Sequence, residues 1–159
     1  MKKLFFIILS LLFFTSVKSF SQENAIGLRL GGGNSIGAEI SFQTPFLSDR
    51  AEIDLGWGSS YNWQNWKLTG IYQWVMRIDN GFYWYLGVGP SIGNWSYIGK
   101  DDGKEKKEGF SLSAALNGGA EYRFSEVPIQ VSLDVRPELP IIYRGSYGWW
   151  LAIGVRYMF

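Results

Sequence analysis

Histidine and cysteine are absent from this chain, so its 14 Asp and Glu residues are the first candidates for acid–base chemistry. Asp54 and Glu121 lie in separate strand-like stretches and could form the carboxylate pair that glycoside hydrolysis requires. Interior salt bridging is the simpler role, since arginines and lysines occur among acidic residues in the same pattern. The lack of histidine excludes Ser–His triads and histidine metal sites.

A second acidic group lies in a polar stretch and contains Asp101, Asp102, Glu105 and Glu108. Clustered carboxylates can bind Ca²⁺. Four lysines are interleaved with these acids, so the stretch is nearly neutral, and we expect a solvated loop without a metal. The sequence therefore predicts no catalytic residue, no cofactor and no enzymatic activity.

The elements that position these side chains have a period of two. Large apolar residues occupy every second place from Ile26 to Leu30, from Ile53 to Trp57 and from Ile129 to Val135. Such alternation is typical of strands with two different faces, and about eight of them can be counted. The pattern predicts an all-β fold, an eight-stranded antiparallel up-and-down barrel, although it leaves the register of the first two strands open.

The connections between these strands differ in length. Asp79–Gly81 and Ser125–Pro128 are short, whereas 94–108 and 138–148 are long and polar. Short turns at one end and long loops at the other are typical of outer-membrane barrels. The stretch Thr44–Arg50 departs from this rule, because we expect a longish turn there at the short-turn end.

The first 21 residues are typical of a secretory signal peptide. Lys2 and Lys3 precede the apolar run 4–14, and small residues at Ser19 and Ser21 suit cleavage before Gln22. The run is too short for a membrane-spanning helix, which needs about 20 residues. Residues 22–159 then form a single barrel domain. It would keep 12 basic and 14 acidic residues, a charge of about −2 that gives no reason to expect a nucleic acid partner.

The two faces of the strands differ in polarity. The polar stripe is almost balanced in charge, and we expect its members to pair in a narrow, plugged lumen: Arg29, Glu39, Glu52, Asp54, Lys67, Arg77, Glu121, Arg123, Asp134, Arg136 and Arg156. The apolar stripe carries aromatic residues near its ends, with Trp57, Trp66 and Trp149 at one rim and Phe42, Phe82 and Phe124 at the other. Aromatic girdles suit the two interfaces of a bilayer, so we expect this stripe to face lipid.

The last stretch, Leu151–Phe159, has large apolar residues at alternate positions and ends on an aromatic residue. With the pattern above, the chain resembles the small outer-membrane β-barrel proteins of the OmpA/OmpX type. In that family the last strand is read by the barrel-assembly machinery, and Val155, Tyr157 and Phe159 occupy the matching positions. The resemblance implies an outer-membrane location, in contact with membrane lipid and lipopolysaccharide. The barrel enzymes of that membrane depend on a catalytic histidine, which this chain lacks.

The sequence favours a structural role or a surface-recognition and adhesion role, because the long loops carry aromatic residues such as Tyr61 and Trp95 that an extracellular partner could contact. Two alternatives remain open. One is a soluble lipocalin-like barrel that binds a small apolar ligand. The other is a narrow porin-like channel.

Overall fold

The computed structural model describes residues 24–33, 36–60, 63–98, 106–142 and 148–159. The predicted signal peptide, 1–21, lies outside these ranges, as do Asp101, Asp102 and Glu105 of the acidic loop. Among the residues described, no helix is long and apolar enough to cross a membrane.

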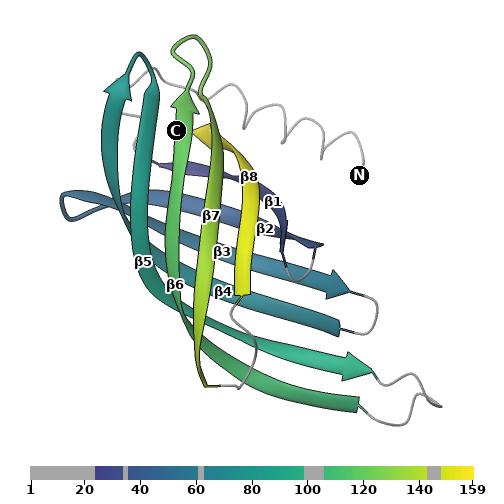
Figure 1. Cartoon of the computed structure of the whole chain (residues 1–159). Coiled ribbons are helices and arrows are strands. Elements are labelled where there is room, and N and C mark those ends of the chain that lie inside the picture. The colour runs from purple at the N-terminus through teal and green to yellow at the C-terminus, as the bar shows by residue number, and fades with distance from the viewer. Residues whose placement is uncertain (1–23, 34–35, 61–62, 99–105, 143–147) are drawn as a thin grey trace, which may run out of the picture.

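The fold is a closed barrel in which each strand is hydrogen-bonded to the next one along the chain (Figure 1). The eight strands are β1 (Ala25–Gly33), β2 (Ile36–Phe46), β3 (Asp49–Ser60), β4 (Trp63–Asp79), β5 (Phe82–Ile98), β6 (Lys106–Arg123), β7 (Ile129–Ile142) and β8 (Gly148–Met158). The prediction of an all-β, eight-stranded antiparallel barrel is confirmed.

The barrel is closed by the first and last strands. Antiparallel pairing of β1 with β8 runs from Ala25 opposite Met158 to Gly33 opposite Trp150. The register of the first two strands, which the sequence left open, places Ile26 opposite Phe42. Closure leaves no sheet edge, so every strand has a neighbour on both sides for its backbone hydrogen bonds.

The tight turns lie at one end of the barrel, which we call the turn end (Figure 1). The turn after β4 contains Asn80 at φ 37° and Gly81 at φ 89°, the left-handed conformations that the Asn-Gly pair predicts. The prediction of a long turn over Thr44–Arg50 is wrong. Strand β2 continues to Phe46 and β3 begins at Asp49, so only two residues connect them, with Leu47 at φ 54°. The remaining connections join the strands at the opposite end, which we call the loop end.

The two faces of the wall have opposite character. From Leu151 in β8 to Phe159 just after it, the residues alternate strictly between exposed and buried, with Leu151, Ile153 and Val155 exposed. Their neighbours Ala152 and Arg156 are buried inside the barrel. Large apolar side chains therefore cover the outside, and the polar stripe fills the inside.

Candidate functional site

The lumen is filled by polar and charged side chains rather than by an apolar core. The largest fully buried side chains include Arg29, Arg136 and Arg156, each with at most 1% of its surface exposed. A buried charge is tolerated only when it is paired and hydrogen-bonded, so the pairing of these three arginines decides whether the lumen is stable.

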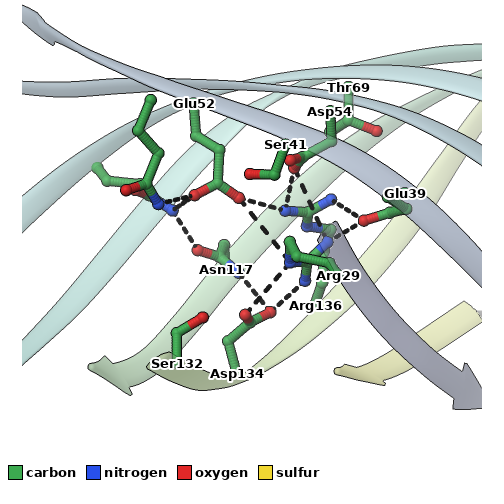
Figure 2. Close-up of polar contacts among 12 residues, drawn as sticks. Arg29, Glu39, Ser41, Glu52, Asp54, Thr69, Asn117, Ser132, Asp134 and Arg136 are labelled. Atoms are coloured by element: carbon green, nitrogen blue, oxygen red, sulfur yellow. Dashed lines mark hydrogen bonds and ion pairs between the residues drawn. The ribbon is translucent and has the colours of Figure 1, made fainter. Parts of the chain in front are cut away.

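Arg29 of β1 reaches across the lumen to two carboxylates. Its Nη1 donates to Glu39 of β2, and its Nη2 donates to Asp134 of β7 (Figure 2). Asp134 also accepts a hydrogen bond from the hydroxyl of Tyr85 at 3.1 Å and one from Asn117 at 3.2 Å. These contacts join five strands, β1, β2, β5, β6 and β7, around one guanidinium group.

Arg136 of β7 makes the complementary set of contacts. Its Nη2 donates to Asp54 at 2.6 Å and to Glu52 at 3.1 Å, both on β3, while its Nη1 donates to Glu39 at 3.3 Å. Glu39 thus accepts hydrogen bonds from both Arg29 and Arg136, as Figure 2 shows. We call Arg29, Glu39, Glu52, Asp54, Asp134 and Arg136 the central cluster.

Arg156 of β8 links the central cluster to the polar side chains that lie nearer the turn end. It donates to Glu52 at 3.3 Å, to Ser41 at 2.9 Å and to Ser132 at 2.8 Å. A layer of buried amides then continues toward the turn end, formed by Gln43, Gln73, Asn117 and Gln130. Amides can donate and accept at once, so they carry hydrogen bonds between charged groups without adding charge.

At the turn end of the lumen, two arginines share one carboxylate. Arg50 Nη1 donates to Glu121 Oε1 at 2.9 Å, and Arg123 Nη2 donates to the same oxygen at 2.7 Å. Arg50 is almost fully buried, whereas the Arg123 side chain is 31% exposed.

At the loop end of the lumen, Lys67 of β4 donates to Glu138 at 2.5 Å and lies 3.7 Å from Glu39. Its ammonium group also lies 5.3 Å from the ring centroid of Trp150. The indole of Trp150 lies so close to Gly31 and Gly37 that a Cβ on either would come within 3.0 Å of it. Glycine at these two positions makes room for the indole inside the wall.

Ten of the eleven charged residues in the predicted network take part in these contacts: Arg29, Glu39, Glu52, Asp54, Lys67, Glu121, Arg123, Asp134, Arg136 and Arg156. The eleventh requires a correction. Arg77 has the inward parity but lies near the end of β4, next to a register shift, where its side chain is exposed. It makes no ion pair within the described part of the chain, because the strand has by then passed the buried section of the lumen.

Sequence reasoning missed other members of the lumen. Arg50 was assigned to a turn and Glu138 to a loop, yet both lie in strands and form ion pairs. Extending the alternation by one or two residues beyond each predicted strand would have identified them. The glutamines of the lumen carry no charge, so only their alternate position along the strand indicates that they face inward.

The predicted girdle residues lie on the outer face. Trp57 is opposite Trp66 across β3 and β4, and both are about half exposed, as is Trp149. At the turn end Phe82 and Phe124 are exposed, whereas Phe42 is only partly so. Val155, Tyr157 and Phe159, the residues of the predicted assembly signal, also point outward.

The site shows no arrangement for the carboxylate-pair chemistry considered above. Asp54 is bound by Arg136 in the central cluster, and Glu121 is bound by Arg50 and Arg123 at the turn end. Across the described ranges, no group of three or more Asp, Glu, His or Cys side chains could hold a metal ion. What the geometry does is pair charges across the lumen.

These features define a class of fold, the eight-stranded transmembrane β-barrel. No protein-family model matches the chain, and no curated protein matches it in sequence. Solved structures do match. The N-terminal β-barrel domain of Pseudomonas aeruginosa OprF is 18% identical, with a TM-score of 0.66, covering 87% of this chain and 98% of that one.

Two further structures are similar to the chain. Neisserial surface protein A is 13% identical with a TM-score of 0.66, covering 89% of this chain and 100% of that one. Ail, the attachment invasion locus protein of Yersinia pestis, is 12% identical with a TM-score of 0.54, covering 86% and 97%. At these identities the likeness establishes the fold that the chain shares with small outer-membrane barrels.

Proposed function

We propose that this protein is an integral outer-membrane barrel without enzymatic activity, with a structural or surface-recognition role and a lumen closed by its charged network. The loop end would face outward and the turn end the periplasm, as in other barrels with short periplasmic turns.

The observation that carries this proposal is the inverted polarity of the wall. Leu30 is 60% exposed, Leu133 54% and Ile153 57%, while Arg29 and Arg136 are fully buried. In water, this many exposed apolar side chains would form a far larger apolar patch than monomeric soluble proteins carry. In a bilayer the same surface lies against hydrocarbon, and closure of the barrel satisfies the backbone.

The same inversion argues against a lipocalin-like role. A soluble barrel that binds a small apolar ligand needs an apolar interior, whereas the centre of this lumen holds Arg29, Arg136 and their carboxylate partners. The porin-like alternative requires a continuous path through that network. Reconstitution in planar bilayers tests it, and we expect no stable conductance from the intact protein.

The location is tested by membrane fractionation with an electrophoretic assay. The protein should remain with the outer-membrane fraction after a high-salt wash. In detergent its mobility should differ between unboiled and boiled samples, because a folded barrel resists unfolding by the detergent. Recovery of the mature chain as a soluble monomer in plain buffer would contradict the proposal.

The expected partners follow from this location. One set of partners is the membrane lipid and lipopolysaccharide that would surround the outer face of the barrel. The other is the barrel-assembly machinery, for which Val155, Tyr157 and Phe159 present an outward apolar stripe at the C-terminal end of the chain. An extracellular partner would bind at the loop end. The structure of Ail was determined with a heparin analogue, sucrose octasulfate, which supports considering recognition as a role for this fold.

A further inference from the structure

Arginines outnumber their ion-paired carboxylates where the lumen opens at the turn end. Arg50, Arg77 and Arg123 all carry inward parity there, but Glu121 is the one carboxylate that pairs with any of them within the described part of the chain. The loop end differs, because Lys67 contacts both Glu138 and Glu39. Among the described residues, this surplus of inward arginines is therefore found at the turn end.

Glu121 cannot compensate further charge, because its two oxygens are already fully engaged. Oε1 accepts from Arg50 at 2.9 Å and from the Nε and Nη2 of Arg123 at 2.9 and 2.7 Å. Oε2 lies 2.8 Å from Arg50 Nη2 and accepts from Gln130 at 2.8 Å. Arg77, which is exposed, is left to solvent.

Tyr83 lies on the strand between Arg77 and Arg123, the two turn-end arginines that solvent reaches. It lies opposite Arg77 in the pairing of β4 with β5, and the guanidinium carbon of Arg123 is 4.2 Å from the centroid of its ring. Cross-strand partners project to the same face, so Arg77, Tyr83 and Arg123 form a row over three neighbouring strands. Stacking on the ring and two hydrogen bonds to Glu121 hold the Arg123 guanidinium in place.

The other acidic groups of the turn end are placed differently. Asp49 accepts hydrogen bonds from the Val75 amide at 3.2 Å and the Tyr72 hydroxyl at 3.3 Å, which fix it against β4. Asp79 lies beyond the register shift in β4, and Glu126 lies in the turn after β6. Both are exposed, and neither forms an ion pair with Arg77 or Arg123 in the described structure.

We propose that Arg77, Tyr83 and Arg123 form an oxyanion site, the turn-end clamp, that binds a phosphate or carboxylate group. Arginine suits such groups because its planar fork can donate two parallel hydrogen bonds. Tyr83, on the strand between the two arginines, adds a phenol hydroxyl that can donate a further hydrogen bond. The geometry of the clamp rests on the fold, whereas its exposure to the periplasm rests on the proposed outer-membrane location. The group could belong to a lipid headgroup of the inner leaflet or to a soluble or polymeric periplasmic anion.

The test uses the folded barrel in a maltoside detergent, which carries neither phosphate nor carboxylate. Inorganic phosphate is titrated while NMR follows the guanidinium Nε–H resonances of Arg77 and Arg123. We expect saturable shifts of both. Arg77→Gln should weaken phosphate binding about tenfold, the effect of losing one charged hydrogen-bonding group. Asp79→Asn is the matched control, since it removes an exposed charge of opposite sign from the same strand end and should leave binding equal or tighter.

Two further arms identify the source of the anion. The first compares nanodiscs of phosphatidylglycerol with nanodiscs of phosphatidylcholine, and the second titrates a sugar carboxylic acid, N-acetylmuramic acid, in maltoside. A shift with phosphatidylglycerol alone indicates a headgroup, and a shift with the sugar acid indicates a periplasmic polymer. Absence of a saturable shift with every probe, or equal phosphate affinity of Arg77→Gln and the parent, would overturn the clamp. Heat-modifiable mobility of each variant is measured in parallel, so failure of the clamp is distinguishable from failure of the barrel proposal.

Discussion

Arg136 and Arg77 share one residue type and one parity, but they lie in very different surroundings. Arg136 is fully buried and contacts Glu39, Glu52 and Asp54 from the middle of β7. Arg77 lies near the end of β4, exposed and without an ion pair in the described structure. Their difference shows that strand parity decides which way a side chain points, while the position along the strand decides whether its charge must be paired.

The comparison also separates two uses of charge in one lumen. In the central cluster, three carboxylates converge on Arg136, so removal of any member leaves charges that water cannot reach. At the turn end, solvent reaches the guanidinium groups of Arg77 and Arg123, and an unmatched charge there costs little. The centre is therefore suited to stability, and the turn-end mouth is suited to binding.

The largest expected effect is that of Arg136→Ala. It leaves Asp54 without the donor at 2.6 Å and removes one of the partners of Glu52. Breaking a buried ion pair costs about 3–5 kcal/mol. We expect a loss of this size in the free energy of unfolding, measured by denaturant titration of the barrel in lipid vesicles.

The matched control for that variant is Val135→Ala, one residue earlier and facing outward. It removes apolar atoms without exposing a charge, so its effect should be much smaller. The double variant Arg136→Met with Asp54→Asn should recover part of the loss, because it removes charge of both signs. Equal stability of Arg136→Ala and Val135→Ala would contradict the central role given to this arginine.

The next effect concerns the outer face and tests what surrounds it. Leu133 is 54% exposed on β7, between two inward residues, Ser132 and Asp134. In a bilayer, arginine at such a position costs about 2–4 kcal/mol near the midplane and less toward the interfaces. In water, substitution of an exposed side chain usually changes stability by less than about 0.5 kcal/mol. We expect Leu133→Arg to show the larger cost, again by denaturant titration in vesicles.

A position nearer the rim serves as the reference for this measurement. Phe124, which is exposed at the turn end, should tolerate arginine better than Leu133 does, because the guanidinium group can reach water there. If both substitutions were neutral, the outer face would not be in contact with hydrocarbon.

The architecture could be predicted from sequence because its signal is repeated along the chain. Most strands show the same alternation, although Ile71 and Val75 interrupt it in β4 and the start of β5 is apolar on both faces. Asn80-Gly81 marks a tight turn by its backbone requirements. What failed was the extent of the strands. Thr44–Arg50 looked like a turn, but the pairing of β2 with β3 continues through Pro45 opposite Arg50. Strand ends depend on pairing across the barrel, which a local pattern does not report.

The alternation along each strand predicted which side chains face the lumen, but it did not predict which of them pair with one another. The sequence showed that Arg29, Glu39 and Asp134 share the inward face, yet their contact joins residues up to 105 positions apart. Such contacts depend on the stagger between strands around a closed barrel. The exposure of Arg77 has the same origin, because alternation records the side of the wall and not the depth within it.

The smallest expected effects separate Arg123 from Arg77, the two arginines of the turn-end clamp. Arg123→Ala loses two hydrogen bonds to Glu121 and the stacking on Tyr83, but Glu121 keeps Arg50 and Gln130 as donors. Its cost should be about 1 kcal/mol, typical of a partly solvated charged contact. Arg77→Ala loses no ion pair in the described structure, so its free energy of unfolding should stay within about 0.5 kcal/mol of the parent. Measured together in vesicles, the order Arg136, Arg123, Arg77 should follow burial; a large loss for Arg77→Ala would mean that the end of β4 is structurally coupled to the network rather than free for binding.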